Sequence, residues 1–112
     1  MTEITDEYMR ERLSKVRGYT LVLLKATPEL EPETHRPLIW EHGRRNMSLV
    51  ADGPLSIVCP VAGDTDLCGI GIFDASEAEV TEIMDGDPAV RAGIFSYEVH
   101  PVRGFPGQAL PG

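Results

Sequence analysis

The chain has 112 residues, of which 42% are hydrophobic and 25% charged, and this size and mixture suit one globular domain with a single core. Eighteen acidic residues face ten basic ones, so the formal net charge is -8. A negative field repels phosphate backbones and anionic lipids, which argues against nucleic acid or a membrane surface as a partner. The first residues lack the regions of a secretory signal, and no apolar run is long enough to span a bilayer. We therefore expect a cytoplasmic protein with reduced thiols.

The first two elements are predicted to be a short helix over residues 5–17 and a strand over residues 19–26. Thr5 is a suitable N-cap, and Gly18 ends the helix. The strand is an almost continuous apolar run, which is typical of a strand covered on both faces. Residues 27–33 hold two prolines and three glutamates and are expected to form an exposed loop.

A long amphipathic helix is predicted over residues 34–52. Thr34 is its expected cap, and Pro37 lies in its first turn, where a missing N–H costs little. Gly53-Pro54 ends it. The residues of its inner side recur at spacings of three and four, and two of them are polar: Leu38, Ile39, His42, Asn46, Leu49 and Val50.

Two strands of a hairpin follow, over residues 55–61 and 67–74. Pro60 cannot donate to a strand ladder, so we expect it at a strand end or on a sheet edge. Gly69 and Gly71 share one face of the second strand and leave that face bare. Another group can therefore approach the strand closely there.

The two cysteines, Cys59 and Cys68, fall on these adjacent strands and are expected to face each other. A cross-strand disulfide and two buried free thiols are the alternatives, and a cytosolic setting favours the free thiols. Neither cysteine has the spacing of a zinc ligand, so no metal site is expected.

The last elements are a helix, a single helical turn and a strand. Ser76 and Glu79 form a capping box for the helix, which ends at Gly86. Asp87-Pro88 then begins the single turn, and residues 94–100 alternate in the manner of a strand.

The predicted order from residue 19 onwards is β-α-β-β-α-β, which is the ferredoxin-like α+β arrangement with a four-stranded antiparallel sheet. Both helices lie on one face of such a sheet. A second copy of the chain is the simplest cover for the other face, so a homodimer is predicted. The expected organisation is a helical extension over residues 1–18, the ferredoxin-like domain over 19–101 and an extended tail over 102–112.

His42 is the first candidate for chemistry, because it points to the inner side of the long helix. It is either a packed, hydrogen-bonded histidine or a general acid/base, since histidine changes charge near neutral pH. Asp87 is either the N-cap of the single turn or a carboxylate that orients His42, and one side chain can serve both purposes. The two helices pack side by side in this fold, which allows His42 and Asp87 to meet.

Other polar residues lie at the expected surface or near this pair. His35 near the helix start and His100 before Pro101 are expected at the surface. Arg45, one turn beyond His42, and Arg91 are either solvated or able to bind an anionic group of a ligand. Trp40 is expected in the core or in a dimer contact, and the chain has no nucleotide-binding loop.

The segment Asp87-Pro88-Ala89-Val90-Arg91-Ala92-Gly93 resembles the DPxxxAG signature of the YciI-related family. Upstream, Gly53 matches the glycine that ends a helix in this family, and Cys59-Pro60 stands where Gly-Pro is usual. Counting back in this register places His42 on the family's histidine. The resemblance covers roughly residues 19–101. Cys59 in place of glycine, and the additional first helix, depart from the pattern.

The resemblance implies ferredoxin-like dimers of the dimeric α+β barrel type, with a His–Asp pair as the proposed active site and without a metal or organic cofactor. Some relatives are dehydrochlorinases of chloroaromatic compounds. One hypothesis is thus an acid–base enzyme, dehydrochlorinase- or isomerase-like, in which His42 and Asp87 act on a small cyclic or aromatic molecule bound by Arg45, Arg91 and Cys59. The alternative is a non-catalytic binding or assembly module in which the His–Asp pair is structural.

Overall fold

The computed structural model describes residues 1–112 and confirms the predicted α+β, ferredoxin-like arrangement. One four-stranded antiparallel sheet has the strand order β2-β3-β1-β4. The elements are α1 (Asp6–Ser14), β1 (Arg17–Ala26), α2 (Pro32–Asp52), β2 (Leu55–Pro60), β3 (Leu67–Phe73), α3 (Glu77–Asp85), α4 (Pro88–Arg91) and β4 (Phe95–Gly104).

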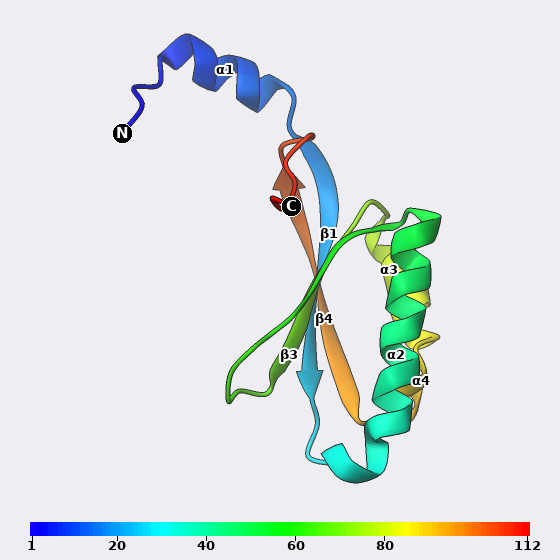
Figure 1. Cartoon of the computed structure of the whole chain (residues 1–112). Helices are drawn as coiled ribbons and strands as arrows, with labels where there is room; N and C mark the ends of the chain where they lie inside the picture. Colours follow the sequence, from blue (N-terminus) through cyan, green and yellow to red (C-terminus); the bar gives the residue numbers. More distant parts are fainter.

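The helices α2, α3 and α4 cover one face of the sheet, as Figure 1 shows. The core lies between these layers, because that is where the strands and helices place their apolar side chains. It consists of nine buried residues: Val22, Leu24, Leu55, Phe73, Val80, Met84, Ala89, Ile94 and Phe95.

The central strand β1 is covered on one face only within this chain. Thr20, Val22 and Leu24 point to the helices and are buried, whereas Leu21 and Leu23 point the other way and are half-buried. The strand was expected to be covered on both faces, with a second copy of the chain as the cover of the second face. Successive side chains alternate between the two faces, and no helix lies on the second one. The homodimer remains a prediction.

The long helix α2 begins two residues before its predicted start. Its N-cap is Glu31, which makes no side-chain capping bond, and Pro32 occupies the first turn. Proline suits this position because its fixed backbone angle is already helical and its missing N–H leaves no donor unpaired. The backbone N–H of Glu31 donates instead to Nδ1 of His35 at 2.9 Å. Thr34, the predicted cap, lies inside the helix.

The last strand, β4, continues beyond its predicted end at residue 100 to Gly104. Pro101 is paired with Thr20 of β1 in this extension. Proline is tolerated there because β4 is an edge strand and bonds a neighbour on one side only. The extended tail accordingly starts after Gly104.

The first helix, α1, projects away from the body of the protein (Figure 1). None of its residues is buried. A cation–π contact joins it to the tail, with the guanidinium of Arg12 5.4 Å from the ring centre of Phe105. No helix of the chain is both long enough and apolar enough to cross a membrane.

Two further expectations need correction. Cys59 is paired with Ile70 rather than with Cys68, so the two cysteines lie on adjacent strands but not directly opposite each other. Both are free thiols and half-buried rather than fully buried, and burial raises the pKa of the Cys68 thiol. Trp40 is 69% exposed on α2, so it is not a core residue.

Candidate functional site

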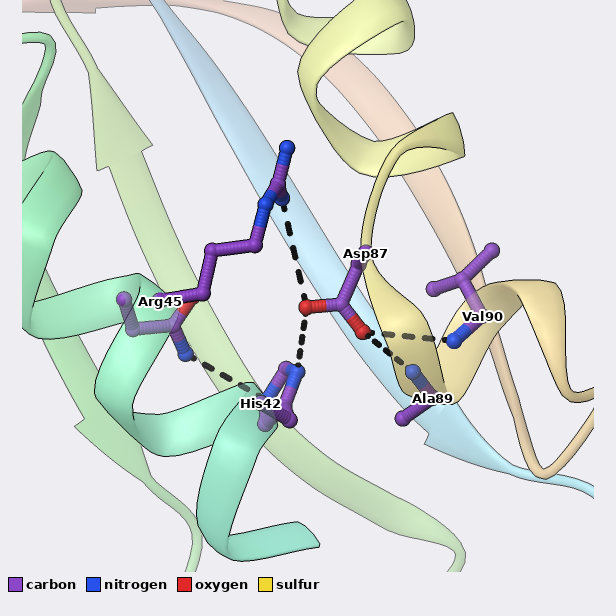
Figure 2. Close-up of polar contacts among 6 residues, drawn as sticks. His42, Arg45, Asp87, Ala89 and Val90 are labelled. Carbon is purple, nitrogen blue, oxygen red and sulfur yellow. Dashed lines mark hydrogen bonds and ion pairs between the residues drawn. The ribbon is translucent and has the colours of Figure 1, made fainter. Parts of the chain in front are cut away.

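The site is built around a hydrogen bond between two elements that lie side by side. His42 on α2 and Asp87, just before α4, meet at 2.8 Å between Nδ1 of the imidazole and Oδ1 of the carboxylate. Asp87 is 1% exposed and His42 9%. The second carboxylate oxygen of Asp87, Oδ2, accepts the backbone N–H groups of Ala89 at 3.0 Å and Val90 at 3.2 Å (Figure 2).

Asp87 therefore combines the two roles considered for it, as N-cap of α4 and as partner of His42. Burial disfavours its charged form, but the hydrogen bonds from His42 and from the N–H groups of Val90 and Ala89 outweigh burial, so the pKa of Asp87 lies below its usual value. An ionised carboxylate can only accept hydrogen bonds. Nδ1 of His42 consequently carries a proton, and Nε2 of the neutral ring is an acceptor.

The imidazole of His42 is held from two further directions. The ring of Phe95 packs edge-on against it, with 5.1 Å between the ring centres. The side-chain amide of Asn46 lies at 3.3 Å from Nε2, on the opposite side of the ring from Asp87. These contacts leave His42 one orientation, in which Nε2 points towards Asn46.

His42 also lines a cavity of about 370 Å³ between α2 and the sheet. Its floor includes Gly69 and Gly71, whose bare faces were predicted from the sequence. Most of the other lining residues are apolar, among them Val58, Met84 and Phe95. Cavities of this kind, apolar with a few placed polar groups, are typical of small-molecule sites.

Asn46 is a residue of the site that sequence reasoning missed, although the helix pattern had placed it on the inner side of α2. It is half-buried, lines the cavity and contacts His42. The spacing of four residues between His42 and Asn46 was an available signal, because residues four apart on a helix lie one above the other.

The three residues predicted to bind a ligand occupy different places. Cys59 lines the cavity. Arg45 is absent from the lining and places its guanidinium 4.0 Å from Oδ1 of Asp87 (Figure 2). Arg91 is exposed and also lies outside the lining.

The remaining histidines stand apart from the pair. His35 accepts a backbone N–H at the start of α2, and His100 is exposed on β4. No group of three or more His, Cys, Asp or Glu side chains is placed to hold a metal ion.

Fold and site together define a ferredoxin-like α+β protein with a buried His–Asp pair beside an apolar cavity. Among solved structures, the chain is similar to TftG, the 5-chloro-2-hydroxyhydroquinone dehydrochlorinase of Burkholderia phenoliruptrix AC1100, in complex with 2,5-dihydroxybenzoquinone. The TM-score is 0.59 and the identity 23%, over 73% of this chain and 90% of that chain. Likeness at this identity establishes the fold alone. No family model matches the sequence, and no curated protein matches it.

Proposed function

We propose that the chain is a YciI-related, cytoplasmic protein and that it catalyses acid–base chemistry on a small cyclic or aromatic molecule. The observation that carries the proposal is the position of His42. Its Nδ1 is held by a buried carboxylate at 2.8 Å, while the ring lines an apolar cavity. A histidine used only for packing has no need of both features.

The chemistry assigns one role to each partner. Nε2 of His42 takes a proton from the ligand, and the ionised Asp87 stabilises the imidazolium that results. In a dehydrochlorination, the electron pair of the broken C–H bond forms the new double bond as chloride leaves. In an isomerisation, His42 returns the proton to another atom. The pair moves the proton by itself, so the proposal involves no cofactor.

The ligand class rests on the cavity and on a protein of the same fold. The cavity offers apolar side chains and two bare glycines, which suit the flat faces of a ring. TftG is named for its action on a chlorinated hydroxyhydroquinone and was crystallised with a quinone. We transfer only the class of ligand, a small ring compound, to this chain.

The alternative is that the pair is purely structural, and the capping role of Asp87 favours it. Asp87 joins the start of α4 to α2 through three hydrogen bonds, so the pair fastens two helices together. In that case, the chain is a non-catalytic binding or assembly module.

The discriminating experiment compares His42→Gln with His100→Gln, which changes an exposed histidine. Chlorinated and hydroxylated ring compounds are assayed for chloride release and for exchange of ring protons in D₂O, and urea unfolding is measured in parallel. We expect His42→Gln to lose about 100-fold or more in rate, as is usual for a general base, while His100→Gln keeps its rate. Full activity in His42→Gln contradicts the proposal. If the wild type shows no turnover and His42→Gln loses only stability, these results support the structural module.

A further inference from the structure

The cavity has a single polar end. Of its 18 lining residues, only His42 and Asn46 carry a nitrogen or oxygen in their side chains. They lie one helical turn apart on α2, so their polar groups meet on the same stretch of the cavity wall. A ligand in this cavity therefore finds polar partners in one place.

The hydrogen bond between these two residues is long and open to replacement. When the single proton of the ring is on Nδ1, Nε2 of His42 accepts from Nδ2 of Asn46 at 3.3 Å, beyond the roughly 2.7–3.2 Å of most such bonds. This is the only side-chain hydrogen bond of the Asn46 amide within the chain. The amide can thus give up its present contact and turn an N–H towards a ligand.

We propose that Asn46 is a second ligand-binding residue and that, with His42, it binds the hydroxyl group of a neutral ring compound, a phenol or an enol. This inference rests on the proposed function of the cavity. One oxygen atom satisfies both residues, because its O–H donates to Nε2 of His42 while its lone pair accepts an N–H of Asn46.

The same arrangement supports a balanced proton transfer. The O–H bond of the ligand breaks, its electron pair stays on the oxygen, and the proton forms an N–H bond at Nε2. The oxyanion keeps the N–H of Asn46, and the imidazolium lies between this oxyanion and Asp87. A donor placed where negative charge develops is the feature that stabilises such a state.

The lining of the cavity argues against ring compounds that carry a carboxylate or a phosphate. No lysine or arginine is among the lining residues, and both Arg45 and Arg91 lie outside it. A carboxylate or phosphate in the cavity would lose its water without gaining a lysine or arginine partner. The rest of the ligand is apolar, since it packs on the floor of Gly69 and Gly71.

The test uses three probes on the full chain: phenol, anisole and benzoate. Anisole has the same ring but no hydroxyl proton, and benzoate carries a charge. Binding is followed by NMR through the side-chain amide of Asn46 and Nε2 of His42. We expect the wild type to bind phenol about tenfold more tightly than anisole, the worth of one good hydrogen bond, and to bind benzoate least.

Asn46→Leu replaces the amide by an apolar side chain with the same branching and the same number of heavy atoms, and Ser48→Ala on the exposed part of α2 is the control. Asn46→Leu is expected to lose the preference for phenol and to keep its affinity for anisole, with urea unfolding confirming the fold; Ser48→Ala keeps both. A preference that survives in Asn46→Leu overturns the role of Asn46 and leaves the proposed ring site standing. If neither ring probe shifts any cavity signal in the wild type, the ring site itself fails, and this inference fails with it.

Discussion

His42 and Asp87 are 45 positions apart in the sequence, and their side chains meet at 2.8 Å in the folded chain. The same carboxylate caps α4 through two backbone N–H groups. The structural and the chemical interpretation of Asp87 are therefore compatible, since one oxygen serves the helix and the other serves the histidine.

Asp87→Asn should destabilise the protein in a pH-dependent way. The variant keeps the shape of the side chain but loses the charge, and we expect a loss of about 1–3 kcal/mol in the free energy of unfolding at pH 7. The folded-state pKa of Asp87 is lowered, so the wild-type advantage is complete above the unfolded-state value of about 3.9 and disappears as the pH falls through the folded-state pKa.

Urea unfolding of both proteins between pH 7 and pH 3 measures this difference. Asp64→Asn, in an exposed loop, is the control and should show no comparable loss. A gap between wild type and Asp87→Asn that stays constant down to pH 3 would argue against a carboxylate with a lowered pKa.

Gly69→Val should fill the cavity without unfolding the sheet. A Cβ atom at Gly69 meets only the carbonyl oxygen of Cys59, at 3.4 Å, which is ordinary contact. We expect stability to change by less than about 1 kcal/mol, since valine suits a strand, while binding of phenol weakens tenfold or more. Gly18→Val, where nothing lies within 4 Å of the added atom, is the matched control. Unchanged phenol binding in Gly69→Val would place the ligand elsewhere.

Arg45→Met tests whether Arg45 acts on Asp87 or on a ligand. The guanidinium lies 4.0 Å from Oδ1 of Asp87, and its Nη1 is buried without a hydrogen-bond partner. The side chain is 30% exposed, so solvent screens the pair, and we expect a loss of only about 0.5–1 kcal/mol that shrinks in high salt. Urea unfolding at two salt concentrations measures it. Unchanged stability together with weaker phenol binding would support the predicted role in ligand binding instead.

The packing of Arg45 also accounts for the absence of a side chain at Gly86. A Cβ atom at Gly86 would lie 2.9 Å from Nη2 of Arg45, so Gly86→Ala displaces the guanidinium. Gly86→Ala should therefore reproduce part of the salt-dependent loss of Arg45→Met, and the double variant should add little to it.

Leu23→Lys should disrupt the predicted homodimer. Leu23, with Leu21, Ile70 and Ile72, lies half-buried on the sheet face that no helix of the chain covers. A lysine there places a charge within the contact between two copies. Light scattering should give twice the 12.3 kDa chain mass for the wild type and the single mass for the variant. Val50, which the helix pattern placed on the inner side of α2, is 40% exposed, so Val50→Lys makes the same charge change at the surface and should remain dimeric. A monomeric wild type rejects the prediction outright.

Features that depend on neighbouring residues were predictable from the sequence. The capping box of Ser76 and Glu79 and the turn opened by Asp87-Pro88 form as expected, because their hydrogen bonds join residues two or three positions apart. The alternation of apolar and polar residues also predicted the element order and hence the fold class. His42 could be named as a candidate for the same reason, since it lies on the inner side of α2, and Asp87 could be named because Asp before Pro is a common start of a helical turn.

Features that depend on distant partners were decided by the tertiary structure. The end of β4 was mispredicted because the pairing of Pro101 requires Thr20, which lies on another strand. The hydrogen bond of His42 with Asp87, and the position of Arg45 behind it, exist only because α2 and α4 pack on the same face of the sheet. Sequence periodicity states which way a side chain points along its own element, whereas the distance between two elements is set by the packing of the core between them.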